Sequence, residues 1–253
     1  MTTEGFSPCL ALVAALPNEG RRVLSRLRGR KTIACGRLDV LQGTLVDREV
    51  IVAFSGLGKV NSAATVAAIL TRFAVSRLWM WGSAGAYPHP GLELTNIALA
   101  SEEILGDEGV VTLNSWQSLS AIGIPLAETE KGPVFNRIPV DQAELERALR
   151  SLRRWQVPSV ASQVLTGPFV TVCGVSGTLA RARLLGQRFG ALCENMEGAA
   201  AAHVCLTYGV PFLELRGLSN WAGDRDKRRW QLEPALDNCQ RALLHLIETW
   251  NDK

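Results

Sequence analysis

Short apolar runs alternate along this chain with segments whose apolar residues recur at helical spacing, and no other feature constrains the fold as strongly. Runs typical of strands are Cys9–Leu16, Asp39–Val46, Val50–Phe54, Arg77–Trp81, Leu94–Ala100, Ser162–Val172 and Pro211–Leu218. The segments predicted to be helical are Glu19–Arg28, Val60–Phe73, Asp141–Leu152, Thr178–Phe189, Met196–Tyr208 and Leu232–Trp250. Strands that alternate with helices predict an α/β fold, in which helices flank a central sheet that is mixed and mostly parallel.

One segment, Gly106–Pro139, departs from this alternation because it shows no clear periodicity. An irregular stretch of about 30 residues inside a compact domain is usually functional or mobile. The chain shows no internal repeat and no linker, so residues 1–253 are predicted to form one domain.

The composition excludes several classes of protein. Hydrophobic residues make up 47% of the 253 residues and charged residues 20%, which is the composition of a globular protein rather than a disordered one. The net charge is only +3 and the basic residues are scattered, so no nucleic-acid partner is expected. No apolar run reaches the roughly 20 residues that span a bilayer, and Cys9–Leu16 follows no basic residue as a signal peptide would. A cytoplasmic protein without a membrane partner is therefore predicted.

The six cysteines stand mostly within apolar runs, and none forms a C-x-x-C pair. They are expected to be reduced core residues, with a disulfide or metal framework as the alternative. No metal site and no cofactor are predicted.

Candidate chemistry is found where strands end, since sites in α/β sheets gather at the carboxyl ends of strands. Those ends carry Pro17-Asn18-Glu19, Ser55–Gly58, Gly82–Ala86, Asn195-Met196-Glu197 and Ser219-Asn220. The two glycine-rich segments are predicted to be turns whose N–H groups hold a hydroxyl, water or phosphate, although such glycines often only make tight turns. The usual nucleotide-loop patterns G-x-x-x-x-G-K-[ST] and G-x-G-x-x-G are absent from the sequence.

Two carboxylates are the leading candidates. Glu19 follows the first strand, where it either takes part in chemistry or complements a helix dipole. Glu197 has small or apolar neighbours, so we expect it to be buried and to need a partner, which Arg216 could supply. His203 is expected to pack within its helix rather than to act as a base.

Taken together and in order, five motifs make the chain resemble the superfamily of nucleoside phosphorylases and nucleosidases. They are Ala15-Leu16-Pro17-Asn18-Glu19, Ser55-Gly56-Leu57-Gly58-Lys59-Val60, Gly82-Ser83-Ala84-Gly85, Met196-Glu197-Gly198-Ala199 and Arg216-Gly217-Leu218-Ser219-Asn220. Within the superfamily the chain is most similar to the futalosine hydrolase family, through Ser101–Gly109, Glu194–Gly198 and Ser219–Asp226. Members of that family split futalosine into hypoxanthine and dehypoxanthine futalosine in menaquinone biosynthesis.

The resemblance implies a set of site residues. Glu19 would hold and activate the attacking water, and Glu197 would bind the ribose hydroxyls and stabilise the ribosyl cation. Ser83 and Arg216 would hold the water and Glu197. The remaining substrate contacts would come from Gly85, Phe169 stacked on the purine, the Val170 backbone at its edge, and Met196 beneath the ribose. For Phe169, a plain core position is the alternative.

Asn220 is a departure that bears on the substrate, because adenine-cleaving nucleosidases carry Asp at this position. Adenine protonated at N7 offers two donors and suits a carboxylate, whereas hypoxanthine protonated at N7 offers one donor beside one acceptor and suits an amide. Asn220 therefore favours a 6-oxopurine, with a proton from water or solvent because an amide is not an acid.

Met80-Trp81 is a second departure, because phosphorylases of the superfamily place an Arg shortly before the Gly-Ser segment to hold phosphate. An apolar pair cannot neutralise a dianion, and Glu19 would repel it, so water is the favoured nucleophile. The open alternatives are a purine nucleoside phosphorylase acting on inosine, a catalytically silent nucleoside-binding protein, and an adenine-specific nucleosidase, which Asn220 disfavours. The resemblance also implies a homodimer or larger homo-oligomer.

The far end of a futalosine-like substrate carries a carboxyphenyl ketone. The candidates for its apolar slot are Trp116, Phe135 and Trp230, and Arg137 is the candidate partner for its carboxylate. Packing for Trp116 and a solvated loop position for Arg137 remain the alternatives.

Overall fold

A ten-stranded mixed sheet forms the centre of the protein. The computed structural model describes residues 8–36, 38–113, 115–155 and 163–250. The strands of this sheet are β1 (Cys9–Ala14), β2 (Arg28–Cys35), β3 (Leu38–Leu45), β4 (Arg48–Phe54), β5 (Val75–Ala86), β6 (Ile97–Leu105), β11 (Arg137–Pro139), β12 (Val164–Thr171), β13 (Cys193–Asn195) and β14 (Phe212–Trp221). The α-helices are α1 (Arg21–Arg26), α2 (Lys59–Arg72), α3 (Gln142–Arg153), α4 (Leu179–Phe189), α5 (Gly198–Tyr208) and α6 (Leu232–Thr249).

The strand order is β11-β6-β12-β13-β5-β1-β4-β3-β2, and β14 pairs with both β5 and β6. These pairings close a ring, because β5 joins β14, β14 joins β6, β6 joins β12, β12 joins β13, and β13 returns to β5. The predicted α/β fold with a mixed central sheet is confirmed. In this sheet antiparallel pairs are as frequent as parallel ones, however. Strand β13 is antiparallel to β5, β14 and β11 are antiparallel to β6, and the β2–β3–β4 meander is antiparallel.

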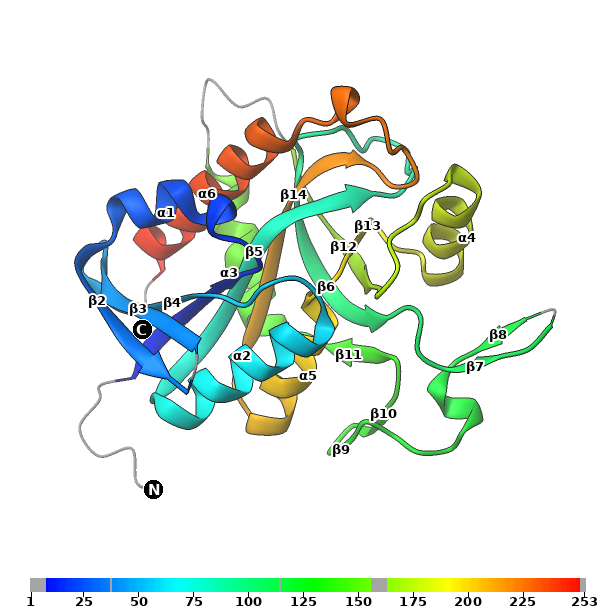
Figure 1. Cartoon of the computed structure of the whole chain (residues 1–253), viewed down its shortest axis with the longest axis horizontal. Coiled ribbons are helices and arrows are strands. Elements are labelled where there is room, and N and C mark those ends of the chain that lie inside the picture. The colour runs from blue at the N-terminus through cyan, green and yellow to red at the C-terminus, as the bar shows by residue number, and fades with distance from the viewer. Residues whose placement is uncertain (1–7, 37, 114, 156–162, 251–253) are drawn as a thin grey trace.

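Helices cover the sheet on both sides, as Figure 1 shows. Helix α2 packs against α5, whereas α6 packs on β14 and β5 and contacts α1 and α3. The strands of the centre are apolar because both of their faces are covered; all six residues of β1 are buried, as are Trp79, Met80 and Trp81 on β5. Each fully buried Val, Leu or Ile contributes about 1.5–3 kcal/mol, so this core dominates the stability of the fold.

The long strand β5 corrects one prediction from the sequence. Residues Gly82–Ala86 were expected to form a glycine-rich turn, but β5 continues through them to Ala86. Neither Gly82 nor Gly85 has a positive φ. The segment stays extended because β14 pairs with it as far as Ala86 and β13 pairs with Gly85 and Ala86. By contrast, Gly56 and Gly58 have φ values of +82° and +95°, so the predicted turn at Ser55–Gly58 is present.

Three further boundaries differ from the prediction. Ser219 and Asn220 lie inside β14 rather than after it. Residues Glu19–Arg28 form a 3-10 turn, η1 (Pro17–Gly20), and the short helix α1 instead of one helix. Strand β2 was missed because most of its residues are exposed, so it lacks the apolar pattern of a buried strand.

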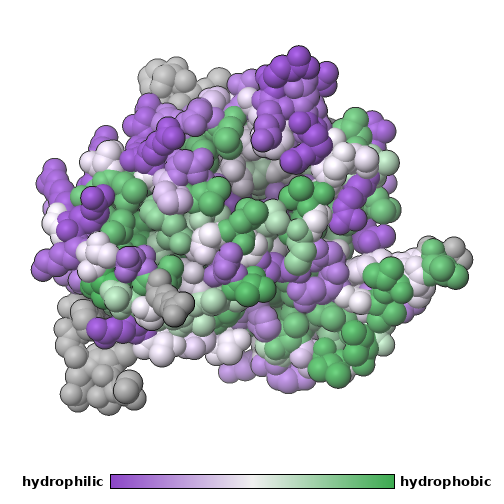
Figure 2. All heavy atoms as spheres, viewed as in Figure 1, coloured by the Kyte–Doolittle hydropathy of each residue, from purple (hydrophilic) through white to green (hydrophobic). Residues whose placement is uncertain are grey.

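The segment 106–139 forms an arm of short elements, which Figure 1 shows extending from the end of β6. They are β7 (Val110–Val111), β8 (Trp116–Gln117), η2 (Leu119–Ala121), β9 (Ala127–Thr129), β10 (Gly132–Val134) and β11. Apolar side chains gather on the surface of this part of the molecule in Figure 2, and Val111, Leu113, Ile122 and Ile124 are exposed. Exposed apolar patches of this kind are typical of interaction surfaces. The homo-oligomer expected from the sequence stays a prediction.

All six cysteines are free, and all but Cys173 are buried, so five of them lie in the core as expected, whereas Cys173 does not. Within the described ranges, no helix is both long and apolar enough to cross a membrane.

Candidate active site

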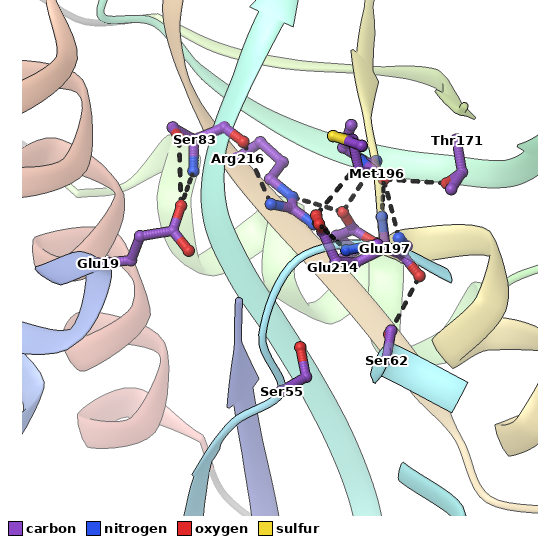
Figure 3. A network of polar contacts seen from close by, with 12 residues as sticks. Glu19, Ser55, Ser62, Ser83, Thr171, Met196, Glu197, Glu214 and Arg216 are labelled. Atoms are coloured by element: carbon purple, nitrogen blue, oxygen red, sulfur yellow. Dashed lines mark hydrogen bonds and ion pairs between the residues drawn. The ribbon is translucent and has the colours of Figure 1, made fainter. Parts of the chain in front are cut away.

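Glu19 lies at the carboxyl end of β1, in η1, where three donors hold its carboxylate; Figure 3 shows the two that Ser83 provides. Glu19 Oε1 accepts from Ser83 N at 3.0 Å and from Ser83 Oγ at 3.1 Å, and Oε2 accepts from Leu16 N at 3.0 Å. The indole N–H of Trp81 donates to Glu19 O at 2.9 Å, which fixes the backbone below the side chain. The residue is 5% exposed. A carboxylate held in this way keeps a set orientation and retains lone pairs for a further donor.

Gly82 separates Glu19 from Arg216 and explains why β5 needs a glycine there. A Cβ at Gly82 would lie 2.6 Å from Arg216 Nη1 and 2.8 Å from Glu19 Oε1. These distances are well inside van der Waals contact, so any side chain at this position would push the two groups apart. The glycine of the Gly-Ser segment is thus required because the side chains of Glu19 and Arg216 approach its Cα closely, and not because the backbone turns there.

Glu197 is the N-cap residue of α5, its side chain makes no capping hydrogen bond, and it is 3% exposed. Its Oε1 accepts from Gly58 N at 3.0 Å, and its Oε2 accepts from Met196 N at 3.3 Å and from Arg216 Nη2 at 3.5 Å. The turn at Ser55–Gly58 therefore delivers a backbone N–H to this carboxylate, whereas the sequence predicted a hydroxyl, water or phosphate as its partner. Burial raises the pKa of Glu197 above its ordinary value, although Arg216 and the Gly58 N–H oppose that rise.

Arg216 is 1% exposed and lies on β14 between the two carboxylates. Its Nη1 donates to Ser83 O at 3.1 Å and its Nε donates to Glu214 Oε1 at 2.6 Å. Burial alone would lower the pKa of Arg216, but the surrounding carboxylates of Glu214, Glu197 and Glu19 raise it. The predicted contact between Arg216 and Glu197 is present, and the shortest ion pair of Arg216 is with Glu214.

Glu214 and Glu103 were not among the predicted site residues, and Asn195 was noted at a strand end without a role of its own. Glu214 and Glu103 are both 0% exposed. Asn195 Oδ1 accepts from Glu197 N at 2.9 Å, Gly198 N at 2.8 Å and Thr171 Oγ1 at 2.9 Å, while its Nδ2 donates to Glu214 Oε1 at 3.2 Å. The sequence did contain a clue to Glu103 and Glu214, because each is a charged residue within an apolar run that is typical of a buried strand. A buried charge needs a partner, so both residues could have been proposed as members of a polar cluster.

Asn220 is 9% exposed and lies one residue beyond a bulge in the β14–β5 ladder. Its Oδ1 accepts from Ser219 Oγ at 2.8 Å and its Nδ2 donates to Trp221 O at 3.1 Å. Each of these atoms keeps one more bonding position, a lone pair on Oδ1 and a hydrogen on Nδ2. The amide can therefore still bind one donor and one acceptor side by side.

Phe169 and Val170 are core residues in the structure, which is a correction to their predicted purine contacts. Both side chains are 0% exposed, and they belong to two different hydrophobic clusters. The backbone of Val170 lies between β6 and β13, so sheet ladders flank it on both sides. Met196 is half-buried beside Glu197, and Gly85 pairs with Glu194 and Asn220 in neighbouring strands.

The candidates for the far end of the substrate already have protein partners. Arg137 pairs with Glu102 and donates to Phe189 O at 3.2 Å. The Trp116 ring packs edge-on against Phe189 with ring centroids 5.5 Å apart. Phe135 is half-buried. Trp230 donates from Nε1 to Asp224 O at 3.1 Å and stacks with Arg225. These contacts favour packing for Trp116 and a surface ion pair for Arg137.

His203 donates from Nε2 to Leu126 O at 3.2 Å, which agrees with a packing role. The arrangement as a whole holds two buried carboxylates near one guanidinium: Glu197 contacts Arg216, and Glu19 lies on the other side of Gly82. Such a pair can orient a water molecule and stabilise a developing cation.

Comparison with known proteins places these residues in context. The sequence profile described as the phosphorylase superfamily matches residues 10–248. A futalosine hydrolase from Thermus thermophilus is 38% identical over 193 residues, 76% of this chain and 79% of that protein. A 5′-methylthioadenosine/S-adenosylhomocysteine nucleosidase from Geobacillus kaustophilus is 26% identical, with 96% of this chain and 98% of that protein covered.

Two solved structures share the fold. A futalosine hydrolase mutant of Helicobacter pylori superposes with a TM-score of 0.80 at 23% identity, covering 96% of this chain and 100% of that one. A 5′-methylthioadenosine/S-adenosylhomocysteine nucleosidase from Neisseria meningitidis, in complex with methylthio-immucillin-A, gives the same TM-score, identity and coverage.

Proposed function

The chain belongs to the phosphorylase superfamily, in which it is a nucleosidase, and from this premise we propose that it hydrolyses futalosine to hypoxanthine and dehypoxanthine futalosine in menaquinone biosynthesis. The relatives support cleavage of an N-glycosidic bond but differ in the purine that their names imply. The choice of substrate therefore depends on the residues that face the base.

The proposed mechanism uses the two buried carboxylates. As the bond between the ribose C1′ and the purine N9 breaks, its electron pair leaves with the purine and a cation develops on the sugar. Glu197 binds the ribose hydroxyls and its charge stabilises that cation. Glu19, held by Ser83 and Leu16, accepts a proton from the water whose oxygen adds to C1′. Solvent supplies the proton that N7 gains.

The observation that carries the choice of substrate is the amide of Asn220. Its free lone pair on Oδ1 matches the N7–H of hypoxanthine, and its free hydrogen on Nδ2 matches O6. Protonated adenine offers two donors instead, so one of them would face the amide N–H. An unpaired buried polar group costs about 1–3 kcal/mol, which is a preference of about tenfold or more for the 6-oxopurine.

The test is to incubate the protein with futalosine, inosine and methylthioadenosine, each with and without phosphate, and to measure the free base and the ribose-side product. We expect hypoxanthine from futalosine at the highest kcat/KM, with a free ribosyl product and no dependence on phosphate. Adenine from methylthioadenosine at the highest kcat/KM would overturn the substrate, and formation of a ribose 1-phosphate would overturn hydrolysis.

The matched variant is Asn220→Asp, which keeps the shape of the side chain and replaces the amide donor by an acceptor. We expect the ratio of kcat/KM for futalosine over methylthioadenosine to fall by about tenfold or more. An unchanged ratio would mean that Asn220 does not face the purine.

A further inference from the structure

Two buried carboxyl groups, Glu103 on β6 and Glu214 on β14, meet beneath the candidate site at the Cα of Gly198. A Cβ at Gly198 would lie 2.1 Å from Glu214 Oε2 and 2.7 Å from Glu103 Oε2. Both side chains are 0% exposed, and a glycine at the start of α5 is what leaves room for them.

The oxygens of this pair lack hydrogen-bond donors unless one of the two carboxyl groups is protonated. Among the described residues, neither oxygen of Glu103 nor Oε2 of Glu214 accepts from a protein donor. The two groups nevertheless face each other, because Glu214 Oε2 and Glu103 Oε2 both lie within 2.7 Å of one point, the position that a Cβ of Gly198 would take. Two ionised carboxylates cannot bond to one another, but a protonated one donates its O–H to the other. Leaving these oxygens bare in the interior would cost more than binding a proton.

The surrounding charges favour a proton on Glu103. Arg216 is the cation of this cluster, and it faces the carboxylates of Glu214, Glu197 and Glu19. Cys193 on β13 also faces the pair and adds no positive charge. Glu214 is the member that Arg216 Nε and Asn195 Nδ2 contact, so Glu214 carries the negative charge. Burial and the neighbouring Glu214 raise the pKa of Glu103 well above its ordinary value.

We propose that Glu103 and Glu214 share one proton as a carboxyl pair, and that this pair positions Arg216 so that the charge of Glu197 stays available to the substrate. Glu214 draws Arg216 Nε to 2.6 Å, and Glu197 is left with a contact of 3.5 Å to the same guanidinium. Glu103 is a neutral donor to Glu214 and keeps the pair at a single negative charge. The catalytic part of this inference rests on the proposed function, whereas the shared proton does not.

The shared proton is tested in the protein without substrate. The infrared spectrum of the wild type minus that of Glu103→Gln, at neutral pH in deuterated buffer, should contain the carbonyl stretch of a protonated carboxylic acid. Gln keeps the shape of the side chain and donates an N–H to Glu214, so this variant should fold. The control is Glu102→Gln, its neighbour on β6, which pairs with Arg137 and should give no such band. A Glu103→Gln difference spectrum without the band would overturn the shared proton.

The positioning role is tested by the pH profile of kcat on whichever nucleoside the wild type cleaves. In Glu214→Gln the guanidinium is released towards Glu197, so the pKa of Glu197 falls. We expect kcat to drop by tenfold or more, with KM changed less, and the acid limb of the profile to move to lower pH. Loss of kcat with an unmoved acid limb would mean that Glu214 only supports the fold.

Glu103 provides a second pair of variants if Glu214→Gln does not fold. Glu103→Gln replaces one neutral donor by another and should leave the acid limb in place and retain most of kcat. Glu103→Leu lacks the donor and should lose kcat by tenfold or more. An acid limb that moves to lower pH in Glu103→Gln would show that Glu103 is ionised and would overturn the assignment. If no nucleoside is cleaved by the wild type, the proposed function fails while the infrared result still decides the shared proton.

Discussion

At the scale of single residues, the charge of Glu197 is set by opposing effects. Burial makes ionisation costly, whereas Arg216 and the N–H of Gly58 favour the ionised form. The position at the amino terminus of α5 adds the positive end of the helix dipole. Because the proposed transition state places a cation beside this carboxylate, its charge should matter more to the reaction than to binding.

We therefore predict that Glu197→Gln lowers kcat by about a hundredfold or more while KM changes little, since the lost charge acts mainly in the transition state. Steady-state kinetics on the preferred nucleoside measure both constants, and circular dichroism shows whether the variant is folded. Glu146→Gln is the control, because Glu146 lies on α3 in an exposed ion pair with Arg150. Turnover close to that of the wild type would remove Glu197 from the mechanism.

At the scale of elements, the decisive feature is that β5 remains a strand through Gly82–Ala86. The site is built across this strand, with Glu19 and Arg216 both in contact with the Gly82–Ser83 segment. The ring of strands fixes that segment from both sides, so its backbone is a rigid platform rather than a loop.

Gly82→Ala should consequently separate Arg216 from Glu19 without unfolding the sheet. The added Cβ would meet Arg216 Nη1 at 2.6 Å and Glu19 Oε1 at 2.8 Å, and the φ of Gly82 is one that alanine adopts. We expect kcat to fall by about tenfold or more, as a small misplacement of catalytic groups is costly. Gly177→Ala is the control, since Gly177 is exposed and its Cβ would meet nothing within 4 Å. Equal kinetics for the two variants would mean that the close approach is not required.

At the scale of the whole molecule, a buried acid makes the stability depend on pH. The pKa of Glu103 is raised in the folded protein above the ordinary value of 4.5 that it has in the unfolded chain. The folded state thus holds this proton more tightly, and the stabilisation is fully present below pH 4.5 and is lost as pH rises through the folded pKa.

The free energy of unfolding of the wild type should therefore decline relative to that of Glu103→Gln as pH rises. Over the pH range in which the folded protein keeps the proton and the unfolded chain does not, the difference between the two free energies of unfolding should change by about 1.4 kcal/mol per pH unit. Urea unfolding of both proteins between about pH 5 and pH 8 measures this difference. The titration of groups that behave alike in the two proteins cancels when the free energies are subtracted. A constant difference across that range would show that Glu103 is ionised in the folded protein.

Local sequence patterns were sufficient to predict the class of fold and the main residues of the candidate site, although Gly82–Ala86 and Ser219-Asn220 lie within strands rather than after them. Apolar runs and helical spacing depend on local period, so they identified most helices and strands, and Glu19, Ser83, Glu197 and Arg216 lie together as the motifs implied. Local pattern did not reveal that Gly82–Ala86 stays extended, because ladder partners distant in the chain hold it in place.

Only the tertiary structure decided which charges meet in the interior. Glu103, Asn195 and Glu214 come from three separate segments of the sequence, and β6, β13 and β14 bring them together beside Arg216. The same packing placed Phe169 and Val170 in the core instead of at the purine. Strand pairing is a non-local interaction, and burial, which sets both charge state and partner, exists only once the strands have paired.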